Sequence, residues 1–282
     1  MVTIRNLGFT YRKTPLFSGL DLDLQPGNIY GLLGRNGTGK TTLLKIVTGQ
    51  LFPLHGDLEV HGYIPKERVP AMLSDIYFLP EEFHLPPMKG GDYMKAYAPF
   101  YPRFEAEGFR RQLEEFELPF DRNLNTLSYG QKKKFLLSFC MATGASLILL
   151  DEPTNGLDIP SKAQFRRLIT GALREDQTIV ISTHQVRDME NMIDPVIILD
   201  DGKIILNRNM NEISRRLSMK MFRNEPDETA VLYAEKVLGG YAAVVEEPSD
   251  DHAVDLEILF NTVMRNREKF AALFGKEDIR HE

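Results

Sequence analysis

The sequence has a single cysteine, Cys140, among its 282 residues. One cysteine excludes an internal disulfide and a multi-cysteine metal site, and the apolar run around it favours a small buried side chain. Long hydrophobic runs are also missing, because the best candidate, residues 135–150, is interrupted by serine, threonine and glycine. A membrane-spanning helix needs roughly 18 consecutive apolar residues, so none is expected. The N-terminus lacks an apolar signal region, which predicts a protein of the cytoplasm.

Basic side chains are scarce between residues 225 and 257. The net charge is −6, and ten acidic residues lie between Glu225 and Glu257 against one base, Lys236. A surface that binds nucleic acid needs clustered lysine and arginine. The pattern therefore argues against nucleic acid as a partner and indicates a solvated accessory segment.

The chain does contain alternating strand and helix patterns. Continuous apolar runs at 147–150, 178–182 and 196–199 are typical of strands buried on both faces of a parallel sheet. Between residues 88 and 143 the apolar spacing is helical, which indicates a helical insertion. A helix is expected at residues 40–48, and further strands at 2–11, 20–24, 29–33, 57–60, 76–79 and 203–206. These patterns predict an α/β fold with a mixed, largely parallel sheet.

The chain beyond about residue 211 has its own pattern. Residues 230–233 and 241–246 are predicted as strands, and residues 255–274 as an amphipathic helix. This part is expected to form a small C-terminal α+β appendage.

A glycine-rich loop lies between the strand at 29–33 and the helix that follows it. Residues 34–41 match the pattern G-x-x-x-x-G-K-[ST], whose backbone N–H groups point at phosphate oxygens. Lys40 is expected to reach the β- and γ-phosphates and Thr41 to hold Mg²⁺; a turn that binds nothing is the alternative. The residues expected to contact a nucleotide here are Gly34, Asn36, Gly37, Thr38, Gly39, Lys40, Thr41 and Thr42. The motif predicts a P-loop that binds the phosphates of a nucleotide.

Two of the buried strands end in polar side chains. After the strand at 147–150, Asp151 is expected to hold Mg²⁺, and Glu152 to orient or deprotonate the attacking water. His184 follows the strand at 178–182 and is expected at the same sheet edge, in contact with the γ-phosphate. The alternatives are structural: a polar end to a core strand, and a histidine that only supports the fold.

Taken in order, the motifs resemble those of the ATP-binding subunit of an ABC transporter. The segments that carry the resemblance are the loop 34–41, Leu127-Ser128-Tyr129-Gly130-Gln131, residues 147–153, Gly156-Leu157-Asp158 and His184. The resemblance covers about residues 1–215 and implies that two subunits enclose two ATP molecules with Mg²⁺. It further implies that Ser128, Gly130 and Gln131 of one subunit contact the nucleotide bound by the other. Tyr11 resembles the aromatic residue that stacks on adenine, although a core position for it is equally compatible with the sequence.

Three positions depart from the pattern of that family. Tyr129 stands where the signature motif usually has a glycine, and Glu81 where a glutamine usually contacts metal and water. The pair Asn155-Gly156 replaces two commoner small residues. Glu81 is still expected to approach Mg²⁺, with an added negative charge near the phosphates.

An aromatic stripe lies in the helical insertion, where the family contacts its membrane partner. Tyr93, Tyr97, Phe100, Tyr101 and Phe104 recur at three- and four-residue spacing. The stripe is either a docking face for a helix of that partner or part of the core.

The resemblance and the patterns together predict four parts. These are residues 1–88 and 146–210 as the ATPase core, 89–145 as the helical subdomain with the signature motif, and 211–282 as the C-terminal accessory segment. The expected function is ATP hydrolysis by a dimer, of two copies or with a paralogue, that drives transport through separate membrane-spanning permease subunits. The chain would then lie on the cytoplasmic face of the cell membrane, and the exporter type is favoured. A soluble ABC ATPase without a transport role and a P-loop kinase for small molecules are the alternatives.

Overall fold

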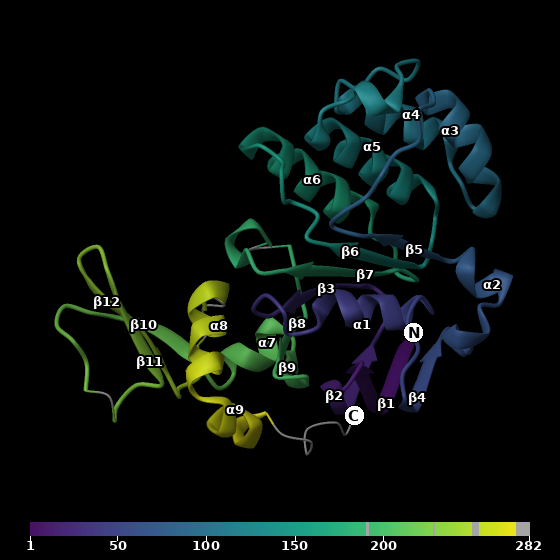
Figure 1. Ribbon diagram of the computed structural model, residues 1–282. Helices are drawn as coiled ribbons and strands as arrows, with labels where there is room; N and C mark the ends of the chain where they lie inside the picture. The colour runs from purple at the N-terminus through teal and green to yellow at the C-terminus, as the bar shows by residue number, and fades with distance from the viewer. Residues whose placement is uncertain (190–191, 228, 250–253, 275–282) are drawn as a thin grey trace.

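A six-stranded sheet forms the centre of the protein, whose computed structural model describes residues 1–189, 192–227, 229–249 and 254–274. The strand order is β5-β6-β7-β3-β8-β9, and all neighbours are parallel except β8 and β9. The strands are β3 (Asn28–Leu33), β5 (Ile76–Leu79), β6 (Leu147–Asp151), β7 (Thr178–Thr183), β8 (Val196–Asp200) and β9 (Lys203–Arg208). Every residue of β6, β7 and β8 is buried, because other elements cover both faces of the sheet (Figure 1). The predicted α/β class and largely parallel sheet are confirmed.

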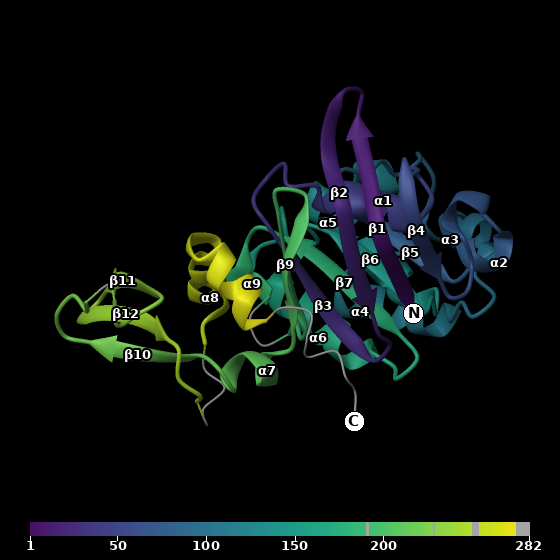
Figure 2. The same ribbon diagram turned by 90° about the horizontal axis from the view of Figure 1, so that it is seen from below.

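One face of this sheet is covered by helix α1 (Lys40–Val47) and, beyond it, by a second sheet (Figures 1 and 2). The second sheet is antiparallel, in the order β2-β1-β4, and consists of β1 (Val2–Tyr11), β2 (Thr14–Leu24) and β4 (His55–Val60). Leu7 of β1, Leu43 of α1 and Leu149 of β6 belong to one buried apolar cluster. The helix that follows the glycine-rich loop is therefore held from both sides.

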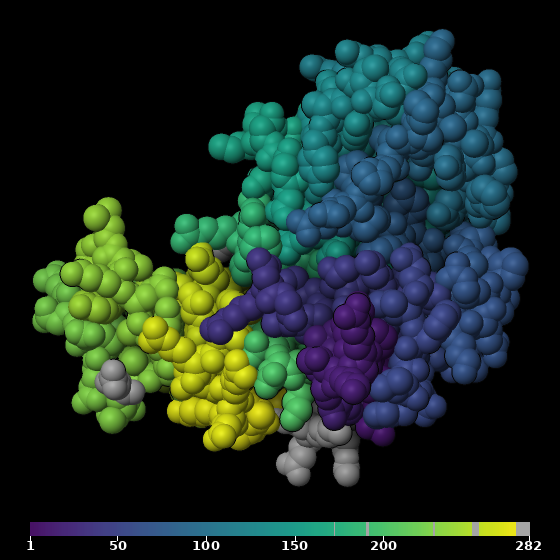
Figure 3. Space-filling view, viewed as in Figure 1, coloured from purple at the N-terminus to yellow at the C-terminus, as the bar shows by residue number. Residues whose placement is uncertain are grey.

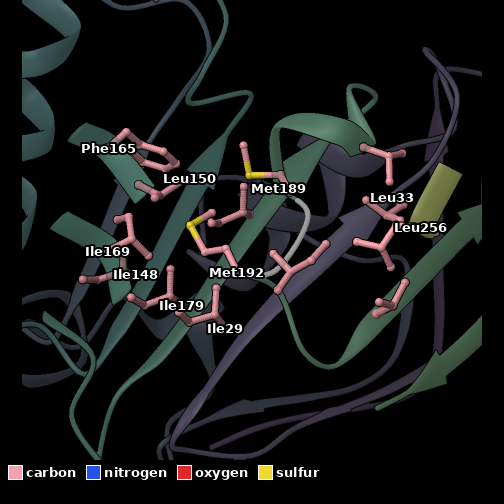
Figure 4. Close-up of a cluster of buried hydrophobic side chains, with 14 of the residues drawn as sticks. Ile29, Leu33, Ile148, Leu150, Phe165, Ile169, Ile179, Met189, Met192 and Leu256 are labelled. Carbon is pink, nitrogen blue, oxygen red and sulfur yellow. The ribbon is translucent and has the colours of Figure 1, made fainter. Parts of the chain in front are cut away.

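The other face of the central sheet carries the helices. They are α3 (Gly90–Tyr97), α4 (Ala106–Glu115), α5 (Tyr129–Ala142) and α6 (Ile159–Ala172). Phe165 and Ile169 of α6 belong to the same buried cluster as Ile148 of β6 and Ile179 of β7 (Figure 4). This packing fixes the helices relative to the strand ends.

Short elements connect these layers. They are α2 (Pro70–Leu73), α7 (Met210–Ser214), and the 3₁₀ turns η1 (Pro65–Glu67), η2 (Ala98–Phe100), η3 (Leu124–Thr126) and η4 (Val186–Met189). Within the described residues, no helix is long and apolar enough to cross a membrane.

The aromatic stripe of the helical region does not share one face. Tyr93, Tyr101 and Phe104 pack against Phe139 of α5, at ring-centroid distances of 5.1, 6.2 and 5.0 Å. By contrast, Phe100 is 67% exposed and Tyr97 is 39% exposed. Most of the stripe therefore belongs to the core. Tyr97 stacks on Tyr93 at a centroid distance of 4.3 Å although it is partly exposed, and Phe100 is the most exposed member of the stripe.

The C-terminal segment stands to one side of the core (Figure 3). It contains an antiparallel sheet in the order β10-β12-β11, followed by two helices. Its elements are β10 (Ser218–Phe222), β11 (Tyr233–Val237), β12 (Gly240–Val245), α8 (Leu256–Arg265) and α9 (Arg267–Leu273). Ion pairs of Glu257 with Arg187 and of Arg267 with Asp200 join it to the core.

Two predictions for this segment are wrong in detail. The strand expected at 230–233 begins only at Tyr233; ahead of it the backbone N–H of Thr229 donates locally, to the Asp227 carboxylate at 2.9 Å. The single helix expected over 255–274 is broken at Asn266, whose side chain donates to the carbonyl oxygen of Leu232 at 2.7 Å. Residue 274 lies beyond the second of the two helices. The division of the chain at residues 88, 145 and 210 stays a prediction.

Candidate active site

The loop between β3 and α1 forms the first part of the candidate site. It passes through Gly37 and Gly39, whose φ angles of 84° and 105° lie in the left-handed region that favours glycine. Lys40 begins α1, and its Nζ donates to the carbonyl oxygens of Gly34 at 2.7 Å and Arg35 at 3.2 Å. The loop therefore encloses a cation at the start of a helix, where the helix dipole also favours an anion.

The Lys40 ammonium lies among carboxylates. Burial lowers the pKa of Lys40, and the negative charges of Glu152, Asp151 and Glu81 oppose that shift. Its Nζ is 3.9 Å from Glu152 Oε1. A bound triphosphate would add negative charge beside this ammonium and would favour its charged form.

Asp151 joins the phosphate loop to the sheet edge. Its Oδ2 accepts a hydrogen bond from Thr41 Oγ1 at 2.7 Å, and its Oδ1 accepts one from the hydroxyl of Ser182 at the end of β7. A carboxylate and a hydroxyl are oxygen ligands of the kind that Mg²⁺ prefers. The structure thus brings together the predicted metal-binding residues Thr41 and Asp151.

The next residue, Glu152, has a backbone conformation that is unusual for its type. Its φ is 46°, in the left-handed region, and its carboxylate is buried. The Oε1 atom accepts from the backbone N–H of His184 at 3.0 Å and lies 2.7 Å from His184 Nδ1. Oε2 accepts from the hydroxyl of Thr183 at 3.1 Å. The predicted pair Glu152 and His184 is therefore in direct contact, with the carboxylate held in a defined orientation.

Tyr11 lies at the surface above α1. Its side chain is 50% exposed, and its hydroxyl is 3.2 Å from Thr42 Oγ1. Phe9 supports it edge-on, at a ring-centroid distance of 4.9 Å. Its exposure contradicts the core alternative and leaves one side of the ring open beside the phosphate loop.

The signature residues form the N-terminus of α5. Ser128 is the N-cap: its Oγ accepts from the backbone N–H of Gln131 at 3.2 Å, and the Gln131 Oε1 atom accepts from the backbone N–H of Ser128 at 3.0 Å. Ser128 is exposed and Gly130 is half-buried. None of the hydrogen bonds found in the described part of the chain links these three residues to the loop 34–41 of the same chain.

Glu81 follows β5, near the signature residues. Its exposed side chain accepts a hydrogen bond from Asn155 Nδ2 at 2.8 Å, and its carbonyl oxygen accepts one from the hydroxyl of Tyr129 at 2.8 Å. It contributes to the negative charge around Lys40, but its hydrogen bond leads to Asn155 and not to Thr41 or Asp151. The metal role predicted for Glu81 stays a prediction.

Several further polar residues belong to the site. Ser182 and Thr183 donate to the carboxylates of Asp151 and Glu152, and their position at the polar end of an apolar strand is a signal that could have identified them. Lys133 is fully buried and donates to the carbonyl oxygens of Glu152 and Asn155 at 2.8 and 2.9 Å. Lys133 is the middle residue of three consecutive lysines, 132–134, so the sequence alone does not distinguish it from its neighbours.

The fold and the site geometry are those of a P-loop nucleoside triphosphatase. Comparison with known proteins identifies the family. The family described as ABC transporter matches residues 17–155. The SkfA peptide export ATP-binding protein SkfE of Bacillus subtilis (strain 168) is 30% identical over 211 residues, which cover 73% of this chain and 87% of that protein. The chain therefore belongs to the ABC transporter family of ATP-binding proteins, and it is an ATPase.

Other relatives agree with this assignment. The high-affinity zinc uptake system ATP-binding protein ZnuC of the same organism is 27% identical over 220 residues, covering 72% of this chain and 92% of that protein. A solved structure of the ATP-binding subunit of an ABC transporter superposes with a TM-score of 0.70 at 22% identity and covers 76% of this chain and 92% of that one. The resemblance inferred from the sequence is confirmed at the level of family and fold.

Substitution of Lys40 tests whether the loop binds phosphate. Lys40→Ala should weaken Mg²⁺-ATP binding about 10- to 100-fold, because a charge-assisted contact to the phosphates is lost. Lys45→Ala, which removes a cation from the same helix outside the loop, is the matched control. Titration calorimetry measures both affinities. Equal affinity of the Lys40→Ala variant and the wild type would contradict the phosphate-loop assignment.

Proposed function

We propose that this chain hydrolyses ATP as a dimer and thereby drives transport through separate membrane-spanning subunits. The observation that carries the proposal is the position of the signature residues. Ser128 is exposed at the start of α5, and its hydrogen bonds connect it to Gln131 and not to the phosphate loop of its own chain. A second subunit can therefore supply the nucleotide that Ser128 and Gly130 contact.

Different residues of the chain bind the nucleotide, accept the proton and orient the general base. Lys40 and the backbone N–H groups of residues 34–41 bind and orient the phosphates, and the open ring face of Tyr11 stacks on adenine. Glu152 accepts a proton from the attacking water as general base, and His184 fixes its carboxylate and faces the γ-phosphate. The Ser128 hydroxyl of the partner subunit closes the site over that phosphate.

Mg²⁺ fits the oxygen ligands that Thr41 and Asp151 bring together. Among the described residues, no cluster of three or more His, Cys, Asp or Glu side chains is arranged to hold a metal ion alone. A cation here would therefore bind together with the nucleotide, with ligands from Thr41, Asp151 and the phosphate oxygens. When bound, it neutralises charge that develops on the phosphates. Glu81 is an additional candidate ligand.

The exposed pair Tyr97 and Phe100 is the docking surface for a helix of the membrane subunit. Tyr97 is the last residue of α3 and Phe100 lies in η2, on the helical side of the molecule. Both side chains are exposed in the single chain. Docking there would hold the chain at the cytoplasmic face of the membrane. The relatives include both a peptide export protein and a zinc uptake protein, so they do not decide the direction of transport. An exporter role for this chain is supported by the Pro80-Glu81 sequence and the C-terminal segment.

A transport role is favoured over a soluble ABC ATPase without one. The relatives named above are described as export and uptake proteins, and they span most of this chain. A P-loop kinase does not explain the signature residues at the start of α5.

Glu152→Gln separates nucleotide binding from chemistry. The amide keeps the shape of the side chain but is a much poorer proton acceptor, so hydrolysis should fall by about 10² to 10⁴-fold while ATP still binds. The variant should accumulate as an ATP-bound dimer in size-exclusion chromatography, and it should run as a monomer with ADP. Glu82→Gln makes the same substitution at an exposed position next to Glu81 in the sequence, and this variant should behave as the wild type. Hydrolysis by Glu152→Gln at the wild-type rate would refute its role as general base.

The docking surface is tested by membrane association. Phe100→Ser removes the most exposed aromatic ring of the pair, so the share of the chain that sediments with membranes carrying its transporter should fall severalfold, while ATP hydrolysis by the purified chain should not change. Leu238→Ser, at a fully exposed apolar position in the C-terminal segment, is the control. If both variants sediment with membranes equally, Phe100 is not part of the docking surface.

A further inference from the structure

The three positions that depart from the family pattern lie together in the structure. The Tyr129 hydroxyl donates to the carbonyl oxygen of Glu81 at 2.8 Å, and Asn155 Nδ2 donates to the carboxylate of the same residue at 2.8 Å. The Tyr129 ring covers Gly156, where a Cβ atom would come within 2.8 Å of it. Phe83 stacks on the same ring at a centroid distance of 5.3 Å. Each unusual residue therefore fits the others.

Lys133, one turn further along α5, extends this cluster to Glu152. The hydrogen bonds of Tyr129, Asn155 and Lys133, together with the α5 backbone that joins Tyr129 to Lys133, make a closed set of links, called here the ring of hydrogen bonds. Its Nζ donates to the carbonyl oxygen of Asn155 at 2.9 Å and to that of Glu152 at 2.8 Å, and it lies 5.4 Å from the centre of the Tyr129 ring. The ring of hydrogen bonds links the start of α5, the loop after β5 and the loop after β6. Three segments that are distant in the sequence are thereby held as one unit.

A buried cation at this place has an energetic cost. Lys133 is 0% exposed, and burial lowers its pKa to about 8, although the negative charges of Glu81, Glu152 and Asp151 oppose the shift. Buried charges are tolerated when hydrogen bonds satisfy them. The carbonyl oxygens that Lys133 binds belong to Glu152 and to the loop after it, so its contacts fall on the backbone of the general base.

The backbone at Glu152 needs such support. A non-glycine residue with a φ of 46° occupies a sparsely populated region and persists only when its surroundings hold it. The hydrogen bond from Lys133 to the Glu152 carbonyl oxygen holds this peptide from the side of α5.

We propose that Tyr129 and Lys133 are positioning residues that tie the signature motif of each chain to the general base of the same chain. This inference rests on the proposed function, because Ser128 must contact the nucleotide of the partner subunit. A phosphate contact at Ser128 in one site then fixes α5, and α5 fixes Glu152 in the other site through the ring of hydrogen bonds. The two ATP sites of the dimer are thereby coupled.

Two variants break the ring at different points. Tyr129→Phe removes one hydroxyl and keeps the aromatic ring over Gly156, while Lys133→Met keeps the length of the side chain and removes all its donors. Tyr63→Phe, at an exposed tyrosine after β4, and Lys132→Met, at the neighbouring half-buried lysine of α5, are the matched controls. Because the Tyr129 side chain is 46% exposed, Tyr129→Phe decides the question even if Lys133→Met fails to fold.

The readouts are the rate of ATP hydrolysis as a function of ATP concentration and the affinity of the monomer for ATP. We expect kcat to fall about fivefold in Tyr129→Phe, for the loss of one hydrogen bond, and at least tenfold in Lys133→Met. The Hill coefficient should be above 1 in the wild type and both controls and should approach 1 in the two variants, with monomer affinity unchanged. A merely structural role would lower stability without changing the Hill coefficient.

The outcomes separate this inference from the function on which it depends. Glu152→Gln is measured in parallel, and its failure to form an ATP-bound dimer would overturn the proposed function itself. If that dimer forms, a wild-type kcat and Hill coefficient in Tyr129→Phe overturn the positioning role alone. Reduced Hill coefficients in both variants, with unchanged controls, support it.

Discussion

The hydrogen bonds of the Asp151 carboxylate join the three elements on which the active site depends. Asp151 ends β6, and it accepts from Thr41 at the start of α1 and from Ser182 at the end of β7. Because β6 and β7 are buried on both faces, this carboxylate has little freedom to move. The phosphate loop, the proposed metal ligands and the proposed general base thus take their positions from one sheet edge.

This edge of the sheet carries several buried charged side chains. The cations Lys40 and Lys133 lie within a site that also contains the carboxylates Asp151 and Glu152, and all four side chains are buried. Burial lowers the pKa of both lysines, and the carboxylates oppose that shift. The two cations contact different parts of Glu152: Lys40 Nζ lies 3.9 Å from its carboxylate, whereas Lys133 donates to its carbonyl oxygen from the signature helix. Charged groups that are held in fixed positions can stabilise developing charge without reorganisation during a reaction.

Local patterns in the sequence predicted the central sheet and much of the site. Continuous apolar runs revealed β6, β7 and β8, since strands buried on both faces carry few polar residues, and the loop motif located Lys40 and Thr41. The ring around Tyr129 could not be predicted, because it joins residues 48 and 74 positions apart whose contacts exist only in the fold. The C-terminal strands were harder for another reason. The half-exposed strand β10 was not predicted. Helix α8 ends before Asn266, whose side chain forms a hydrogen bond with Leu232, and the spacing of apolar residues along the helix does not indicate such a contact.

If each ATP site is shared between two chains, two inactive variants should restore activity when they are mixed. Ser128→Arg should block the signature contact and Lys40→Ala the phosphate loop, so each variant alone should hydrolyse ATP hardly at all. A mixed dimer contains one site in which the intact Lys40 of one chain faces the intact Ser128 of the partner subunit. We expect the mixture to regain hydrolysis well above either variant alone. A mixture no more active than its components, or full activity of Ser128→Arg by itself, would contradict a site shared between two chains.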